Sequence, residues 1–486
     1  MPLATISVAL AHAERDASDE PALASQLASL RGRIEEPLRV AIVGRISAGK
    51  STLVNALVGQ RVAPTDAREC TKLVTWYRYG PVPLYRVVHD DGSTTEHPLP
   101  ADGRLPSNVG VEPRDPVRIA VELPCPLLRE LTLIDTPGLG SPDRDGGGST
   151  HDLLSHGRST AALPQADALI VLLGADGARD YEVAAVTEPV TALGLPAIGA
   201  LSRADSGPGP DPIAASAAVA RGLASDLTGI VTEVRPLAGL IAETALTGSL
   251  GDADVSVIRV LAALDAADRR RVLRTPDRFR AAEHVGTPAA RRRLLGLLGI
   301  TGVRMAAEAI DRGAHDADAI ADALRSRSGI DELRQQLLEH FARRTDLLKA
   351  AASISAIGRL GFGRSEHRGS AVVAALVETA ERVALSPHMR LLDLMRAKAQ
   401  VDAGQLALPD DLRADLARLV RDAPAHIRAG ASLPTDRAIR EAIRQRSVRW
   451  AAYESRAAPR QAHVARLALE QYLQLFDGVD EPVPRR

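Results

Sequence analysis

The stretch that decides the fold is "VAIVGRISAGKST" at residues 40–52. An apolar run leads into the spacing G-x-x-x-x-G-K-[ST], completed by Gly44, Gly49, Lys50 and Ser51, and a helical pattern follows. A strand, a glycine-rich turn and a helix in this order form a phosphate-binding loop, because backbone N–H groups and the helix N-terminus surround the anion. The motif predicts a nucleotide site in which Lys50 contacts the β- and γ-phosphates and the Ser51 hydroxyl binds Mg²⁺.

A second stretch, "LTLIDTPGLG" at residues 131–140, supplies the partner that such a loop needs. Its strand pattern brings Asp135 to a strand end, where the carboxylate would hold Mg²⁺ through water, and Gly138 would offer its backbone N–H to the γ-phosphate. Between the two motifs, Thr71 in "ECTKLVTW" is positioned to bind Mg²⁺ and close over the γ-phosphate as a switch. Thr65 is the rival for that role, although a plain Pro-Thr-Asp turn is the simpler interpretation of it.

The residues that would read the base lie in "LSRAD" at 201–205, directly after a strand. Ligands of an open parallel sheet bind at the carboxyl ends of its strands. Asp205 would accept hydrogen bonds from N1–H and N2–H of guanine, Arg203 would stack over the base, and Ser202 would tie the segment weakly to the phosphate-binding loop. The stretch "VRPLAGL" places Ala238 and Gly239 where a backbone N–H would meet guanine O6. The alternative is a solvated aspartate in an ordinary turn.

Composition and charge argue against several classes of protein, namely nucleic-acid-binding, secreted and membrane-spanning proteins. The 486 residues exceed one compact core, and few aromatic residues (2%) leave cores built from aliphatic side chains. Scarce aromatic rings and a net charge of −1 argue against nucleic acid as a partner. Cys70 and Cys125 lack metal-ligand spacing and fit a reducing compartment. The N-terminus lacks the basic region of a signal peptide, and the longest uncharged run, residues 189–202, is shorter than the ~20 residues of a membrane-spanning helix.

Apolar runs that alternate with helical stretches between residues 38 and 245 predict an α/β domain with a mainly parallel sheet and helices on both faces. The runs interpreted as strands are "LRVAIVG", "TKLVTWYRY", "YRVVHDD", "VRIAVEL", "ELTLID", "DALIVLL" and "PAIGAL". After about residue 250 the pattern becomes helical. The predicted domains are a helix at 1–36, the α/β domain with its phosphate-binding loop at 37–330, and an all-α bundle at 331–486.

These motifs resemble those of the dynamin-like GTPases. "GRISAGKS", "CT", "DTPG" and a long helical tail are similar to bacterial dynamin-like proteins, and above all to the actinobacterial isoniazid-inducible subgroup, where the guanine motif also takes a Ser-Arg-Ala-Asp form. The resemblance implies a GTPase head at 37–330, with a helical neck and trunk at 1–36 and 331–486. It also implies hydrolysis of GTP to GDP with Mg²⁺, nucleotide-dependent head-to-head pairing with a second copy or a paralogous dynamin-like protein, and membrane remodelling.

The resemblance also assigns individual residues. Ser47 matches a position that helps neutralise charge between the β- and γ-phosphates, and Ala48 and Thr52 belong to the nucleotide-binding set. Ile46 stands where eukaryotic dynamins carry a glutamine that orients the attacking water. Because isoleucine cannot hydrogen-bond water, Thr71 is left to hold it. The expected catalytic residues are Ser47, Lys50, Thr71 and Gly138.

The resemblance further implies a cytoplasmic protein that touches the inner face of the cell membrane peripherally, with anionic lipid as its partner. Residues 269–293 carry nine arginines against two acidic residues, and residues 437–466 carry eight against two. Such surfaces attract anionic lipid, although a solvated helix face is the simpler interpretation of each. A third candidate is the apolar "AAASISAIGRLGFG" at 350–363, interpreted as a lipid-inserting loop or as a hinge packed on the bundle.

Three functions therefore compete. The first is a self-assembling GTPase that remodels membranes. The second is a soluble GTPase that acts on ribosomes or tRNA, although the sequence shows no appended nucleic-acid-binding fold and has a long helical tail. The third is a nucleotide-binding scaffold with negligible turnover, as one half of a heteromeric pair, which Ile46 and the altered guanine motif keep open.

Overall fold

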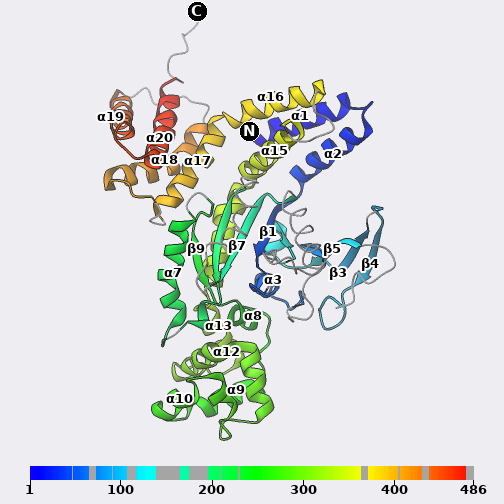
Figure 1. The fold of residues 1–486 in the computed structure, drawn as a ribbon, viewed down its shortest axis with the longest axis vertical. Coiled ribbons are helices and arrows are strands. Elements are labelled where there is room, and N and C mark those ends of the chain that lie inside the picture. Colours follow the sequence, from blue (N-terminus) through cyan, green and yellow to red (C-terminus); the bar gives the residue numbers. More distant parts are fainter. Residues whose placement is uncertain are drawn as a thin grey trace, which may run out of the picture. The chain divides into compact units, whose positions relative to one another are not determined.

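The computed structural model contains two compact units. The sheet unit comprises Pro37–Leu223 and Val234–Arg343, and the helical unit comprises Met1–Glu36, Ala224–Glu233 and Arg344–Arg486. Figure 1 shows the elements of both units. The structure describes residues 1–45, 47–64, 73–89, 91–106, 116–137, 165–174, 195–207, 209–227, 230–362, 370–402, 406–428 and 437–477.

One nine-stranded sheet lies at the centre of the sheet unit. Its strands are β1 (Leu38–Gly44), β2 (Val74–Tyr79), β3 (Leu84–His89), β4 (Thr94–Pro98), β5 (Pro116–Leu123), β6 (Leu131–Asp135), β7 (Ala168–Gly174), β8 (Ala197–Ser202) and β9 (Val234–Leu237). Their spatial order is β4-β3-β5-β2-β6-β1-β7-β8-β9. Five pairings are parallel, and β2–β6, β3–β4 and β3–β5 are antiparallel, so the predicted mainly parallel sheet is confirmed.

The position of β1 follows from its composition. All seven of its residues are buried, as expected of a parallel strand covered on both faces. Two strands, β4 and β9, were not predicted from the sequence, and both lie at the edges of the sheet. β4 is polar and largely exposed, and β9 has only four residues, one of them Pro236, a residue that edge strands tolerate.

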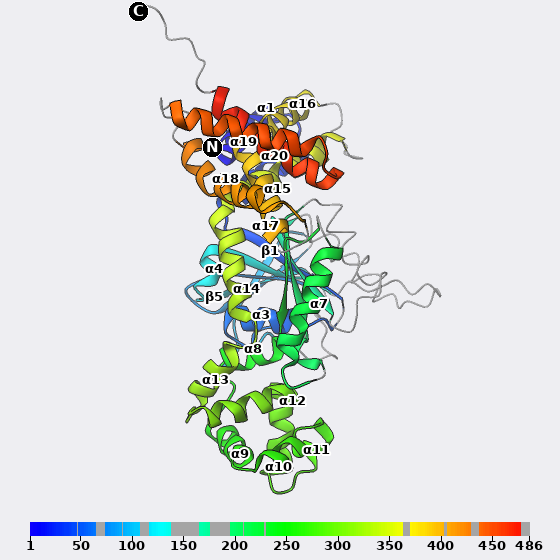
Figure 2. The same cartoon turned by 90° about the vertical axis from the view of Figure 1, so that its left-hand side faces the viewer.

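Helices cover both faces of the sheet, as predicted. Figure 2 shows α7 (Pro212–Asp226) and α14 (Ile330–Gln336) on opposite sides of the strands. The sheet unit also contains the helical elements α3 (Lys50–Val58), α4 (Leu127–Glu130), η2 (Ala204–Ser206), α8 (Gly239–Leu246) and η3 (Leu337–Phe341), and η4 (Ala342–Arg344) spans its boundary with the helical unit.

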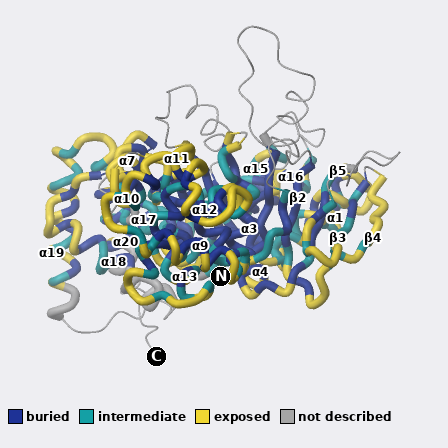
Figure 3. The backbone as a smooth tube through the Cα atoms, turned by 90° about the horizontal axis from the view of Figure 1, so that it is seen from below, coloured by how far each residue is buried: buried dark blue, intermediate teal, exposed yellow. Residues whose placement is uncertain are grey.

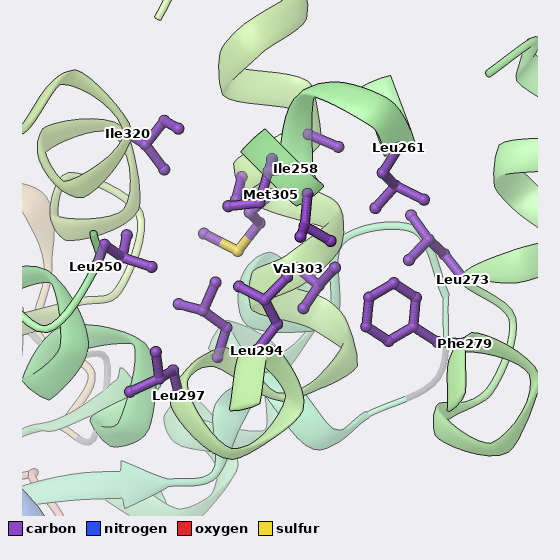
Figure 4. Packing of buried hydrophobic residues seen from close by; sticks show 14 of the residues in the cluster. Leu250, Ile258, Leu261, Leu273, Phe279, Leu294, Leu297, Val303, Met305 and Ile320 are labelled. Atoms are coloured by element: carbon purple, nitrogen blue, oxygen red, sulfur yellow. The ribbon is translucent and has the colours of Figure 1, made fainter. Parts of the chain in front are cut away.

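Five further helices of the sheet unit form a lobe with its own core, here called the helical lobe. They are α9 (Asp252–Ala262), α10 (Ala266–Val272), α11 (Pro276–Arg280), α12 (Pro288–Asp311) and α13 (Ala317–Arg325). Figure 4 shows Leu294 and Val303 of α12 packed with Leu261 of α9 and Phe279 of α11 in one buried cluster. The outer residues of α10 and α11 are mostly exposed (Figure 3).

In the helical unit, α1 (Pro2–Asp16) and α2 (Pro21–Glu35) pack with α15 (Thr345–Phe362) and α16 (Ala371–Ala384). Buried Lys349 joins α15 to the end of α2, because its ammonium donates to the carbonyls of Arg33 (2.6 Å), Ile34 (3.0 Å) and Glu36. In the described part of the chain, no helix is both long and apolar enough to cross a bilayer.

The remaining helices of this unit, α17 (Pro387–Asp402), α18 (Asp410–Arg428), α19 (Arg437–Glu454) and α20 (Pro459–Asp477), share a second core. At its centre lies the buried carboxylate of Asp415. Trp450 Nε1 and the Tyr472 hydroxyl each donate to Asp415 Oδ2 at 2.8 Å, and Arg418 and Arg446 pair with Oδ1.

The sheet unit has its own buried tryptophan, Trp76 on β2. The guanidinium carbons of Arg39, Arg78 and Arg118 lie 4.8, 4.7 and 4.7 Å from the centre of its ring. Because a cation over an aromatic face is attracted by the ring electrons, these contacts join β1, β2 and β5 through one side chain.

Candidate nucleotide-binding site

The phosphate loop, residues 44–51, connects the end of β1 to the start of α3. Gly44 leaves little room for a side chain, because a Cβ atom would lie 3.0 Å from the Leu172 carbonyl oxygen on β7. Gly49 has φ +94°, a left-handed conformation that favours glycine, and it caps α3. The two glycines of the motif therefore have different roles: Gly44 lets the loop pack against β7, and Gly49 makes the turn that points the N-terminus of α3 into the loop.

Lys50 begins α3 and is buried within the loop. Its Nζ donates to the Gly44 carbonyl at 3.2 Å and to the Arg45 carbonyl at 3.0 Å. These carbonyl oxygens hold the ammonium at the helix N-terminus, where anions are favoured. The charge is thus positioned in the loop before any phosphate arrives.

Ser51 and Asp135 meet at the ends of neighbouring elements. The Ser51 hydroxyl donates to Asp135 Oδ2 at 2.9 Å, and parallel pairing of β1 with β6 brings Asp135 level with Ile42. Asp135 is completely buried, and this burial raises its pKa from 3.8 to about 6, against the opposing effects of Lys50 and of the Ser51 hydrogen bond. Its Oδ1 is one of the few buried side-chain atoms of the described residues without a hydrogen-bond partner.

This donor set fits a hard divalent cation. Mg²⁺ prefers oxygen ligands and keeps several waters, so one hydroxyl and one carboxylate at the phosphate end of the loop suit it. The partnerless Asp135 Oδ1 gives the fit a structural basis, because an unpaired buried carboxylate oxygen needs a cation or an ordered water. Ser51 and Asp135 are therefore the residues that would hold Mg²⁺ here.

The base loop, residues 202–205, is fixed by four different elements. The Ser202 hydroxyl donates to the Leu173 carbonyl on β7 at 3.0 Å, and Arg203 donates to the Ser47 carbonyl at 2.9 Å. The Ala204 carbonyl lies 3.0 Å from the hydroxyl of Ser216 on α7, which is shared with the Pro212 carbonyl, and the Asp205 carbonyl accepts from Thr301 on α12 at 2.8 Å. Asp205 is partly buried, and desolvation raises the pKa of its carboxyl above the usual value.

Two of these ties correct the sequence analysis. Ser202 donates to a neighbouring strand and not to the phosphate loop, and Arg203 makes the bond between the two loops that was predicted for Ser202. The predicted stacking of Arg203 over the base stays a prediction. Arg203 and Ser47 are also the two non-glycine residues with positive φ in the described chain (+55° and +60°). Backbone in sparsely populated conformations gathers at functional sites, so their contact marks the junction of the two loops.

The Ala238 backbone N–H differs from its predicted role, because it donates to the Ser328 carbonyl at 2.9 Å rather than pointing to an open base site. Ala48 and Thr52 lie in the loop and in the first turn of α3, as their spacing requires. The predicted Thr71 and Gly138, with Ile46 and the rival Thr65, lie outside the described residues. The sequence analysis missed Ser216 and Thr301; the glycines inside the pattern "GLLGITG" were the available signal for a break in α12.

Some arginines of the two candidate membrane surfaces, residues 269–293 and 437–466, are buried or paired and therefore cannot contact lipid freely. Of the nine arginines at 269–293, Arg291 is buried and donates to three backbone carbonyls, and four others form ion pairs with acidic residues. Exposed positions on the helical lobe are Arg270, Arg274, Arg278 and Arg292. At 437–466, Arg446 faces Asp415 inside the bundle. The stretch interpreted as a possible lipid-inserting loop is helical from residue 350 to residue 362, within α15.

Comparisons with known proteins agree with this geometry. A dynamin-family model matches residues 40–179. The isoniazid-induced protein IniC of Mycobacterium tuberculosis is 32% identical over 407 residues, covering 81% of this chain and 80% of IniC. IniA of the same organism is 35% identical over 161 residues (31% of this chain, 23% of IniA), and dynamin-like protein 2 of Campylobacter jejuni is 32% identical over 133 residues (26% and 20%). The predicted resemblance is confirmed, and this chain belongs to the dynamin family of GTPases.

Proposed function

We propose that the chain binds GTP with Mg²⁺ and hydrolyses it to GDP and phosphate. The observation that carries the proposal is the contact of Ser51 with Asp135, because a buried carboxylate oxygen without a hydrogen-bond partner lies beside the hydroxyl that a metal would need. The buried Lys50 ammonium at the start of α3 and membership of the dynamin family support the same assignment.

The residues divide the work of phosphoryl transfer, which depends on positioning and charge neutralisation. Mg²⁺ would supply positive charge to the phosphate oxygens, with Ser51 as its ligand and Asp135 behind it. Lys50 adds a second positive charge at the same place. Ser47, Thr71 and Gly138 keep their predicted roles, in which Ser47 neutralises charge, Thr71 holds the metal and the attacking water, and Gly138 donates its N–H.

Guanine is the base that Asp205 would read. Its carboxylate accepts two donors from guanine, N1–H and N2–H, which adenine does not offer. The Arg203 bond to the phosphate loop supports this role, because it fixes the distance between the base-reading residue and the phosphates. The loss of charge-assisted hydrogen bonds in Asp205→Ala should cost about 1.5–3 kcal/mol each.

Self-association and membrane contact complete the proposal. The helical unit would serve as neck and trunk, and the head would pair, in a nucleotide-dependent way, with a second copy or a paralogue. The presence of both IniC and IniA in M. tuberculosis supports the paralogue option. The exposed arginines of the helical lobe support binding of a cytoplasmic chain to an anionic membrane surface.

The central experiment is a titration with GTP and Mg²⁺. Lys50→Ala should remove measurable binding while far-UV circular dichroism stays unchanged, because the phosphate charge loses its partner. Lys398→Ala on α17 makes the same change of charge in the helical unit and should bind as the parent does. Equal affinity of Lys50→Ala and the parent would refute the nucleotide site.

A second experiment separates the membrane-remodelling GTPase from its rivals. GTP turnover per molecule is measured over a range of protein concentrations, with and without liposomes of anionic lipid, alongside co-sedimentation. Pairing predicts a rate that rises with concentration or on the liposomes. A flat rate in all conditions would favour the low-turnover scaffold or activation by another protein, and RNA that co-purifies with the chain would favour work on ribosomes or tRNA.

A further inference from the structure

The helical lobe contacts the base loop at a break in α12. Gly299 has φ +60° and ψ 178° in the middle of this 24-residue helix. Essentially only glycine adopts this combination of φ and ψ, so the glycine at position 299 determines where the helix breaks. A Cβ on Gly299 would lie 3.7 Å from Asp205 Oδ2, an ordinary contact distance, which means that backbone conformation and not space requires the glycine.

The break presents Thr301 to Asp205. The Thr301 hydroxyl is buried and donates to the Asp205 backbone carbonyl at 2.8 Å, across 96 residues of sequence. Helix kinks have identifiable causes, and here the glycine kink lies beside the carboxylate that would accept the base. Thr301 thus holds the backbone of Asp205, while Gly299, two positions earlier in α12, lies beside the Asp205 carboxylate.

Both halves of α12 are held firmly on either side of the break. The same buried cluster contains Leu294, Leu297 and Leu298 before the break and Val303 and Met305 after it. Figure 4 shows Leu294, Leu297, Val303 and Met305 in this cluster. The hydroxyl of Thr244 on α8 donates to the Leu297 carbonyl and fastens the first half. A group carried by a packed helix holds its partner more accurately than one carried by a loop.

We propose that Thr301 is a specificity-determining positioning residue, which aligns the Asp205 carboxylate with the N1–H and N2–H donors of guanine. The inference rests on the proposed function, since it assumes that Asp205 reads the base. Loss of the hydroxyl frees the Asp205 backbone to rotate. A ligand that engages both carboxylate bonds then loses more affinity than a ligand that engages one.

Inosine nucleotides make the test specific, because hypoxanthine keeps N1–H and lacks the 2-amino group. Dissociation constants for GDP and IDP are measured by titration calorimetry in Mg²⁺ on the full chain, for the parent, Thr301→Val and Thr301→Ser. Thr301→Val should lower the IDP-to-GDP ratio of dissociation constants by about fivefold, the equivalent of one neutral hydrogen bond. Thr301→Ser keeps the hydroxyl and should keep the parent ratio.

Thr244→Val is the matched control, because it removes a buried hydroxyl bonded to the same helix, away from the base loop. It should lower stability without changing the ratio. Thr301→Ala, which introduces no added bulk, keeps the test decisive if valine disturbs folding, and it should behave as Thr301→Val does.

The outcomes separate the two levels of the proposal. ADP bound as tightly as GDP by the parent would overturn the guanine assignment, and this inference with it. A parent that prefers GDP over ADP, with an unchanged IDP-to-GDP ratio in Thr301→Val and Thr301→Ala, would overturn the inference and leave the guanine assignment intact. An equal fall of the ratio in Thr244→Val would also overturn it, because the effect would then belong to the packing of the lobe.

Discussion

Two buried carboxylates, one in each unit, differ in how completely they are hydrogen-bonded. In the helical unit, Asp415 is surrounded by four donors that come from three helices. In the sheet unit, Asp135 is completely buried, yet one of its oxygens has no hydrogen-bond partner and the other accepts from Ser51.

The difference separates a carboxylate that the fold satisfies by itself from one that we propose binds a cation. A buried charge is tolerated when it is paired and hydrogen-bonded, and Asp415 meets both conditions. Asp135 is held in a costly state, with a raised pKa, at the place where a cation would be bound. Groups with strongly perturbed pKa values in such positions are candidates for function, because a bound cation would relieve the cost of burying the charge.

The largest effect is expected from Asp415→Ala. Removal of the carboxylate leaves Trp450, Tyr472 and two arginines without their partner in a packed core, which should lower the free energy of unfolding of the helical unit by about 3–5 kcal/mol. Urea unfolding followed by far-UV circular dichroism measures the loss. Asp411→Ala on the same helix removes only an exposed ion pair with Arg449 and should change stability by less than about 1 kcal/mol. A similar loss in both variants would contradict the comparison.

The second prediction concerns pH. Because the folded chain raises the pKa of Asp135 from 3.8 to about 6, this carboxyl favours the nucleotide-free fold below about pH 4, and the contribution disappears as pH rises through 6. Asp135→Asn has no such proton. The variant should therefore gain stability over the parent between pH 4 and pH 7, by about 3 kcal/mol at the upper end. Unfolding midpoints at several pH values measure the difference, and parallel curves would show that burial costs Asp135 nothing.

The same Asp135→Asn substitution should weaken the metal site. An amide keeps the shape and loses the charge that would hold Mg²⁺ through water, so the Mg²⁺ concentration needed for half-maximal GTP binding should rise by about 10–100-fold. The variant would then be more stable and less able to bind, which is the signature of a functional group. Unchanged Mg²⁺ dependence would assign the carboxylate to structure, as in the bundle.

The smallest effect tests how many donors Asp415 needs. Tyr472→Phe removes one hydroxyl and leaves Trp450 Nε1 on the same oxygen, so the helical unit should lose about 1 kcal/mol. Tyr453→Phe on α19 is the matched control at the edge of the same cluster. A loss as large as that of Asp415→Ala would mean that the tyrosine itself, and not the whole set of donors, satisfies the charge.

The sequence could predict those parts of the site that depend on short-range patterns. The phosphate loop needs its glycines within a few residues of Lys50, and a strand pattern is enough to bring Asp135 to the end of a strand. The contacts between these parts could not be predicted, because 156 residues separate Arg203 from Ser47 and 96 separate Thr301 from Asp205. Edge strands β4 and β9 were missed for a related reason, since their pairing partners, and not their own composition, make them strands.

The chain has two tryptophans, one in each unit. Trp76 lies among three guanidinium groups in the sheet unit, and Trp450 donates a hydrogen bond to the Asp415 carboxylate in the helical unit. Each is therefore a built-in fluorophore for its own unit. Trp450→Phe leaves an emission that reports the sheet beside the nucleotide site, and Trp76→Phe leaves one that reports the bundle. Red shifts of the two signals on heating would show whether the units melt together or one after the other, and the addition of GTP should raise the melting temperature reported by Trp76.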